Sequence, residues 1–189
     1  SVKQVTFPLA PIYKRKGIEF HQAFATELHG EGDSTTDQPY VTVRYTDSNR
    51  QGQIDKIEYD FLINATGPKL NFAATPGLGP DGNSWSVCTA SHAEETAKEF
   101  NKVLAKLKAG QNQTFLIGMG HGTCTCQGAA FEYTFNVEHE LTKEGVRDKA
   151  EVIYITNEEH LGDFGMDGMN FGIKGSIVSS QAFTESLFQ

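Results

Sequence analysis

The chain has 189 residues and is acidic, because 24 Asp and Glu side chains outnumber 16 Lys and Arg side chains and give a formal net charge of −8. Nucleic-acid-binding proteins neutralise phosphates with clustered basic residues. The only basic run here is Lys14–Lys16, so we exclude nucleic acid as a partner. No stretch approaches the ~20 apolar residues of a spanning helix, which predicts a soluble or peripheral protein. Three cysteines are too few for a disulfide framework and favour reactive or buried thiols.

The first third of the chain predicts a short helix followed by strands. Pro8–Lys16 has a helical pattern that Gly17 ends, and Ile18–Phe20 has the composition of a strand. Apolar and polar residues alternate in Tyr40–Tyr45 and again in Ile54–Tyr59, with a turn-rich segment between them. This alternation predicts a β-hairpin with one face open to solvent.

An apolar segment and a loop follow the hairpin. Tyr59–Ala65 is continuously apolar, as expected of a strand covered on both faces, and ends at Thr66–Pro68. Glycine and proline dominate Lys69–Gly82, which indicates a boundary between two parts of the chain. The predicted organisation is a first domain over 1–68, a linker over 69–83 and a second domain over 84–189.

A helix is predicted after Cys88. Ser91, with Glu94 three residues later, forms the pattern of a capping box, and Gly110 is placed to end the helix. Its apolar residues recur at helical spacing and predict one buried face: Ala93, Ala97, Phe100, Leu104 and Leu107.

The stretch Thr114–Tyr133 predicts a buried strand, a glycine-rich turn and the start of a helix. The helix extends from about Gly128 to Glu144, and a second strand covers Val152–Thr156. We therefore expect an α/β fold with a βαβ unit in addition to the hairpin. After this unit, Ser176–Phe188 predicts a terminal helix whose apolar residues form a face for self-association, that is, for a homo-oligomer.

The glycine turn between strand and helix has the layout of a dinucleotide-binding turn, although a turn that binds nothing is the alternative. It carries His121, Cys124 and Cys126 where such a turn needs small, inert residues. Cys126 directly precedes a helix, where the positive end of the macrodipole favours a reactive thiolate. The plain alternative for Cys126 is a small buried apolar residue. Cys124 is interpreted as a bystander.

Cys88 lies in a similar place, before a helix that carries His92 in its first turn. If the neighbouring strands are adjacent, Cys88 and His92 converge on the same crevice as Cys126. Zinc is the competing interpretation, but these cysteines and His92 lack the paired spacing of structural zinc sites. We therefore expect no metal.

Three blocks together identify a known family. They are VCTASHAEE (Val87–Glu95), CQGAAFEY (Cys126–Tyr133) and YDFLINATGPKL (Tyr59–Leu70). The chain resembles sulfide:quinone oxidoreductase, an FAD-dependent flavoprotein with two dinucleotide-binding domains. The resemblance implies a Rossmann-like FAD/NAD(P)-binding architecture, incomplete in this chain. Related patterns occur in flavocytochrome c sulfide dehydrogenases and in type II NADH dehydrogenases.

The resemblance also implies roles for individual residues. The positions along the FAD cofactor are Ala65, Thr66, Gly67, Pro68 and Lys69. Cys126 corresponds to the sulfur carrier beside the flavin and Cys88 to a further cysteine that handles polysulfide. His92 and Glu132 correspond to positions proposed for proton transfer. Cys124 is additional to the family pattern, and Asp163 replaces a histidine that some members carry.

By the same resemblance, the partners are sulfide, a quinone and a membrane surface. The implied location is peripheral, on a prokaryotic cytoplasmic membrane reached through a C-terminal part that this chain lacks. The family's first glycine-rich turn for FAD is also missing, so we expect an internal piece that holds no FAD and is inactive alone. The alternative of another class is a non-catalytic Rossmann-like nucleotide-binding module.

Overall fold

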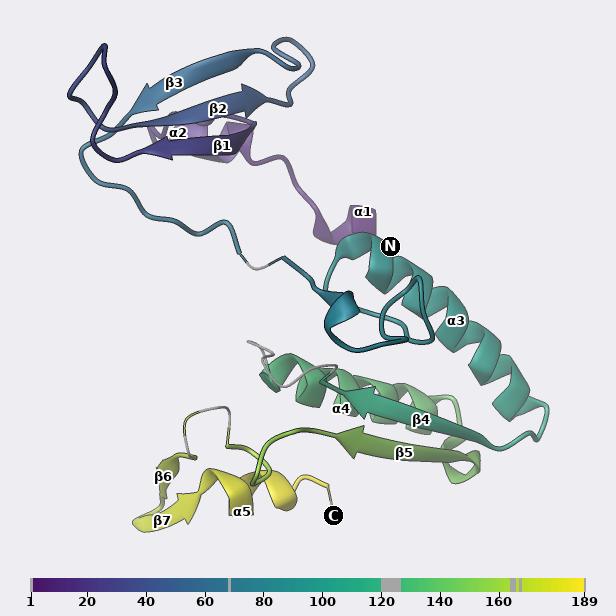
Figure 1. Ribbon diagram of the computed structural model, residues 1–189. Helices are drawn as coiled ribbons and strands as arrows, with labels where there is room; N and C mark the ends of the chain where they lie inside the picture. The colour runs from purple at the N-terminus through teal and green to yellow at the C-terminus, as the bar shows by residue number, and fades with distance from the viewer. Residues whose placement is uncertain (1, 68, 120–126, 164–165, 167, 189) are drawn as a thin grey trace. The chain divides into compact units, whose positions relative to one another are not determined.

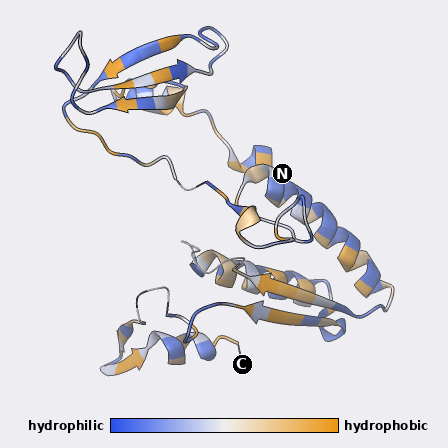
Figure 2. Ribbon diagram, viewed as in Figure 1, coloured by the Kyte–Doolittle hydropathy of each residue, from blue (hydrophilic) through white to orange (hydrophobic). Residues whose placement is uncertain are grey.

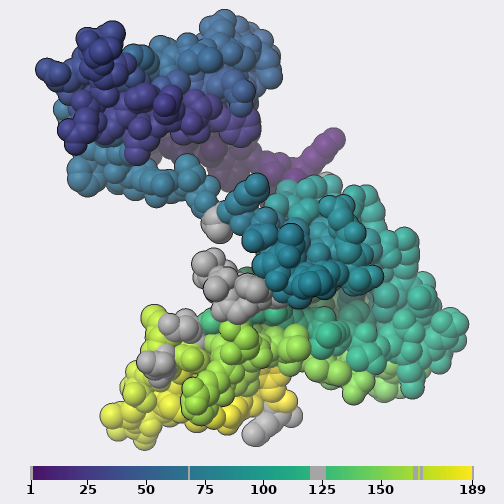
Figure 3. Space-filling model, viewed as in Figure 1, coloured from purple at the N-terminus to yellow at the C-terminus, as the bar shows by residue number. Residues whose placement is uncertain are grey.

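The computed structural model describes residues 2–67, 69–119, 127–163, 166 and 168–188. These residues form a mixture of helices and strands with open sheets, in agreement with the predicted α/β class (Figure 1). The chain divides into two compact units, Ser1–Lys69 and Leu70–Gln189. Figure 3 shows the first unit in purple to blue and the second in teal to yellow. The assignment of these parts to FAD and second dinucleotide-binding domains stays a prediction.

The first unit contains two short helices and one antiparallel sheet in the order β1-β2-β3. Its elements are α1 (Val2–Val5), α2 (Ala10–Arg15), β1 (Ala23–His29), β2 (Tyr40–Tyr45) and β3 (Ile54–Glu58).

The predicted hairpin is confirmed: Val41 pairs with Ile57 and Val43 with Asp55 across antiparallel β2 and β3. The turn forms because the Asp47 carboxylate accepts the backbone N–H groups of Asn49 and Arg50, both at 3.0 Å. The buried hydrophobic side chains of the unit come from β2 and are Tyr40, Val43 and Tyr45.

Two predicted strands in this unit are wrong. Ile18–Phe20 is not a strand; it leads from α2 to β1, and the Phe20 ring stacks on Tyr13 at 5.2 Å. Tyr59–Ala65 is not a strand either, because no strand pairs with it among the described residues. Its side chains are correspondingly exposed, Phe61 by 84% and Ile63 by 78%. Strand β1 was not predicted.

The second unit begins with a loop that contains the 3₁₀ helix η1 (Phe72–Ala74) and continues with the predicted βαβ unit. Its main elements are α3 (Ala90–Lys108), β4 (Gln113–Gly118), α4 (Gln127–Lys143), η2 (Arg147–Lys149) and β5 (Ala150–Ile155). Strands β4 and β5 are parallel, with Phe115 opposite Val152, and α4 connects them. The cap of α3 differs from the prediction: Thr89, not Ser91, is the N-cap.

The core of this unit lies between the two long helices and one face of the β4–β5 sheet. Leu107 from α3 and Leu141 from α4 are both fully buried. The residues packed around them are Val137, Val146, Ala150, Phe100, Val103, Leu104, Phe115, Ile117, Tyr133 and Val152. The opposite face of the sheet carries exposed Leu116, Ile153 and Ile155, so both strands are orange in Figure 2 although only one face is covered.

The final segment is only partly helical. Strands β6 (Asn170–Ile173) and β7 (Ser176–Ser179) form a hairpin, and α5 is short, Ser180–Glu185. The predicted helix over Ser176–Phe188 is therefore wrong in its first turn, because those residues pair with β6 instead.

Within the described residues, no helix has the length and apolar character needed to cross a membrane.

Candidate functional site

The ends of several elements meet at one edge of the second unit. Because β4 and β5 are parallel and α4 joins them, the start of α4 lies at the edge where both strands end, Gly118 and Ile155 (Figure 1). Helix α3 leads into the other end of β4. Ligands of open α/β sheets bind at this edge, outside the carboxyl ends of the strands.

Cys88 is exposed and directly precedes the N-cap of α3. The Thr89 hydroxyl accepts the His92 backbone N–H at 3.2 Å and thereby satisfies one of the free donors of the first helical turn. On the other side, the Cys88 backbone N–H donates to the Ser86 hydroxyl at 3.2 Å. The thiol is thus accessible on a backbone that is hydrogen-bonded before and after it.

His92 is half-buried in the first turn of α3, beside Phe72 of η1. The two rings lie 5.8 Å apart and are tilted by 54°. Phe72 lies close over Gly79, where an added Cβ would come within 2.6 Å of its ring. Within the described part of the chain, the buried Nδ1 of His92 has no hydrogen-bond partner.

Glu132 lies on α4 with its side chain exposed. The helix begins at Gln127, close to the predicted start, and the Oε1 atom of Gln127 is buried without a partner among the described residues. Cys126, the predicted sulfur carrier, immediately precedes that residue and lies outside the described residues, as do Cys124 and His121. The structure therefore supplies the helix that follows Cys126 but not the geometry of its thiol.

The predicted cofactor positions lie at the end of the first unit. Ala65, Thr66, Gly67 and Lys69 are exposed, and Pro68 lies outside the described residues. The Asn64 side chain accepts both the backbone N–H of Thr66, at 3.2 Å, and its hydroxyl, at 2.9 Å. Gly67 has φ +75°, and an added Cβ would meet no atom within 4 Å. The backbone at Gly67 is therefore accessible.

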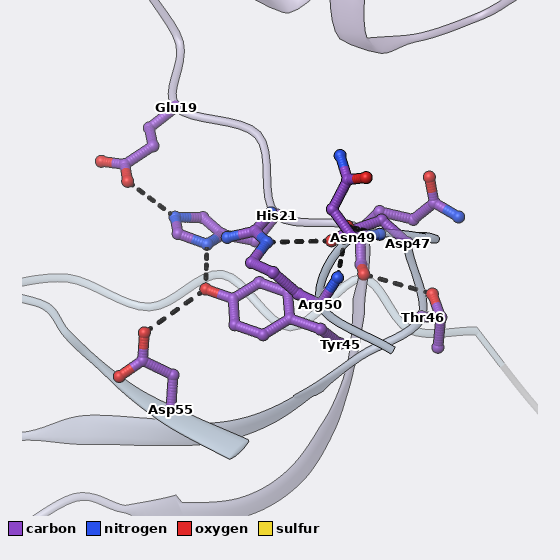
Figure 4. A network of polar contacts seen from close by, with 9 residues as sticks. Glu19, His21, Tyr45, Thr46, Asp47, Asn49, Arg50 and Asp55 are labelled. Carbon is purple, nitrogen blue, oxygen red and sulfur yellow. Dashed lines mark hydrogen bonds and ion pairs between the residues drawn. The ribbon is translucent and has the colours of Figure 1, made fainter. Parts of the chain in front are cut away.

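The first unit contains a polar network that the sequence patterns did not indicate (Figure 4). The buried Tyr45 hydroxyl lies 2.8 Å from Nδ1 of His21 and donates to Asp55 at 3.5 Å. Nε2 of His21 lies 2.9 Å from the Glu19 carboxylate, and the Arg50 guanidinium lies 3.7 Å from the centre of the Tyr45 ring. These contacts satisfy a buried hydroxyl and fix the hairpin to the segment before β1.

A second cluster joins β2 and β3 to the loop before them. Asp33 accepts from the Lys56 ammonium at 2.7 Å and from the Tyr40 hydroxyl at 2.5 Å. The hydrogen bond from Lys56, followed by those from Thr35 and Tyr40, holds the pKa of Asp33 well below its ordinary value. The same bonds raise the pKa of Lys56 and of Tyr40, because Asp33 stabilises their protonated forms. These hydrogen bonds hold the sheet together, and we do not interpret the cluster as a binding cleft.

Within the described residues, no group of three or more His, Cys, Asp or Glu side chains could hold a metal ion. The zinc alternative depends on Cys124 and Cys126, which lie outside that part of the chain.

Comparison with known proteins finds a relative that matches nearly the whole chain. The chain is 34% identical over 186 residues to the sulfide-quinone reductase of Aquifex aeolicus (strain VF5). The predicted resemblance is confirmed. The match covers 98% of this chain and 36% of the relative, so the chain spans about a third of that protein's length. No family model matches the chain.

Proposed function

We propose that the protein carrying this chain is a flavin-dependent sulfide:quinone oxidoreductase that oxidises sulfide to polysulfide or sulfur. The match over 98% of the chain is the observation that carries this proposal. The architecture proposed for the two units is that of Rossmann-like FAD/NAD(P)-binding domains, and the parallel β4–α4–β5 unit supports it.

The proposed nucleophile is Cys126, because it directly precedes a helix, where a thiolate is favoured. Hydrosulfide attacks a disulfide or persulfide sulfur at this cysteine. One S–S bond breaks, a new one forms to the incoming sulfur, and the displaced sulfur leaves as a thiolate with the electron pair. Cys88, exposed before α3, is proposed to take part in the same exchange as the sulfur chain grows.

His92 and Glu132 are proposed to move the protons of this reaction. His92 supports this proposal by its place in the first turn of α3, four residues after the exposed Cys88. Glu132 supplies a carboxylate exposed on α4.

The stretch Ala65–Lys69 is proposed to lie along FAD. Its described residues fit this role, since they are exposed and Gly67 leaves open space where another residue would place a Cβ. The chemistry that bound FAD would supply there is two-electron transfer from the sulfur to quinone. A peripheral position on a membrane, where quinone is dissolved, belongs to the same proposal.

The proposal is tested by mass spectrometry of the protein after incubation with sulfide and a soluble quinone. Sulfane sulfur should appear on the peptide of Cys126, and quinone should be reduced in proportion to sulfide consumed. Replacing quinone by cytochrome c, or sulfide by NADH, distinguishes the flavocytochrome and NADH dehydrogenase alternatives. Flavin-loaded protein that reduces quinone with NADH and not with sulfide would overturn the proposal.

A further inference from the structure

The segment that enters α3 is attached to the helix by a buried hydrogen bond. The Thr96 hydroxyl, on the second turn of α3, donates to the backbone carbonyl of Ser86 at 2.7 Å. Thr96 and Ser86 are exposed by only 8% and 9%. Breaking this bond would leave a buried carbonyl without a donor, which is unfavourable because the carbonyl has already lost its contact with water. The bond therefore holds the segment firmly.

Ser86 also restrains the backbone of Cys88. While its carbonyl accepts from Thr96, its hydroxyl accepts the backbone N–H of Cys88 at 3.2 Å. The residue after Cys88 is the N-cap Thr89, whose backbone carbonyl accepts the Ala93 N–H at 2.9 Å. Cys88 is therefore held from both sides, while its own side chain is exposed.

Exposure differs sharply between neighbouring side chains of this segment. Ser86 is buried, whereas Trp85 and Val87 are 52% and 39% exposed. Ser86, which accepts the hydrogen bond from Thr96, thus faces the helix. The exposed thiol lies on a backbone that these hydrogen bonds hold in place.

We infer that Thr96 and Ser86 are positioning residues that fix the Cys88 thiol for sulfur exchange. This inference rests on the proposed function for its purpose, but the anchoring is a property of the described residues alone. Neither residue is expected to touch a substrate; both act through the backbone of Cys88.

The test places a nitroxide spin label on Cys88. With Cys124→Ser and Cys126→Ser, Cys88 is the one remaining cysteine of the three in the chain. Thr96→Val keeps the shape of the side chain but removes its hydroxyl, and Thr96→Ser restores that hydroxyl. Electron paramagnetic resonance should show a more mobile label in Thr96→Val and an unchanged label in Thr96→Ser.

A second label site separates local release from general loosening of α3. Asn101→Cys, with Cys88→Ser, places the label on an exposed position of the same helix. Its mobility should not change in Thr96→Val. Equal mobility at Cys88 with and without the Thr96 hydroxyl would overturn the inference, as would an equal increase at both label sites.

Ser86→Ala keeps the test decisive if Thr96→Val does not fold. It removes only the acceptor for the Cys88 N–H, and it should increase label mobility at Cys88 with an unchanged circular dichroism spectrum. An unchanged label in this variant would contradict the inference. Sulfide-dependent quinone reduction is measured in parallel on unlabelled variants that retain Cys88, Cys124 and Cys126. A further outcome is that the label mobility changes as expected while no variant, wild type included, oxidises sulfide. In that case the proposed function is wrong, but the anchoring of Cys88 is still supported.

Discussion

Gly118 and Ile155 lie opposite each other at the ends of β4 and β5, so close that a Cβ on Gly118 would fall 1.8 Å from the Ile155 carbonyl oxygen. Only glycine permits the two strands to pair up to the edge where the candidate site lies. The glycine that begins the glycine-rich turn is thus required by the sheet itself, whatever the turn binds.

Gly118→Ala should therefore destabilise the second unit by roughly 2 kcal/mol or more, because the new methyl group overlaps backbone that cannot move cheaply. Trp85 is the chain's single tryptophan, so its fluorescence during urea unfolding reports on this unit. Gly128→Ala is the matched control: an added Cβ there meets nothing within 4 Å, and alanine favours the helix. Equal stability of the two variants would contradict the close approach.

Leu141→Ala should cost about 2–5 kcal/mol, since it leaves a cavity beside the equally buried Leu107. Leu116→Ala removes the same atoms from a side chain that is 65% exposed on the open face of β4. Its cost should be under about 1 kcal/mol. The two free energies of unfolding are measured by the same fluorescence assay. Similar losses in both variants would show that the open face of the sheet is covered.

Asp33→Asn should lower the melting temperature of the first unit at neutral pH. A carboxyl whose pKa falls on folding stabilises the folded state above its ordinary pKa of 3.8 and loses that contribution as the pH falls below it. The difference from wild type should therefore shrink in acid. The dependence on pH is the reverse for Lys56, because folding raises its pKa. Lys56 stabilises the folded state below its ordinary pKa of 10.5, and this stabilisation is lost as the pH rises beyond that value.

Amide NMR signals of Tyr40 and Val43 follow this unfolding, because both residues lie in the central strand β2. Asp60→Asn changes an exposed carboxylate outside the cluster and serves as the control. A difference between Asp33→Asn and wild type that stays constant from pH 7 to about pH 2 would refute the role of the Asp33 charge.

The last segment should self-associate. Ile177 is 80% exposed on β7, and Phe183 and Leu187 are 44% and 47% exposed in and just after α5. Large exposed apolar surfaces favour association. Sedimentation velocity should show a mass that rises with concentration, and Ile177→Lys should reduce that rise. A wild-type chain that stays monomeric at high concentration would contradict this prediction.

Local sequence patterns are sufficient to predict an element whose structure depends mainly on its own residues. The alternation in Tyr40–Tyr45 predicts β2 at its observed bounds, and the strand–glycine–helix pattern predicts the βαβ unit. The continuously apolar run Tyr59–Ala65 predicts a strand wrongly, because a strand also needs a partner and none pairs with it among the described residues. Strand β1, with five consecutive exposed residues inside it, has no clear alternation to detect.

The same division applies to the candidate site. The position of Cys88 and His92 at the start of a helix could be predicted from sequence, although two overlapping capping patterns made Ser91 look like the N-cap in place of Thr89. The anchoring of Cys88 through Ser86 and Thr96 could not, since it depends on a contact between residues ten positions apart. No sequence pattern marks a serine whose backbone carbonyl and hydroxyl both accept hydrogen bonds.

The measurement that tests the central claim is sulfide-dependent quinone reduction by the protein that carries this chain, compared between Cys126→Ser and Cys124→Ser. Retained flavin absorption is checked in each variant. Loss of the nucleophile that forms the covalent intermediate should lower kcat on the order of a thousandfold or more, whereas loss of Cys124 should leave it near wild type. Wild-type turnover in Cys126→Ser, or an inactive Cys124→Ser, would contradict the assignment of Cys126 as the sulfur carrier.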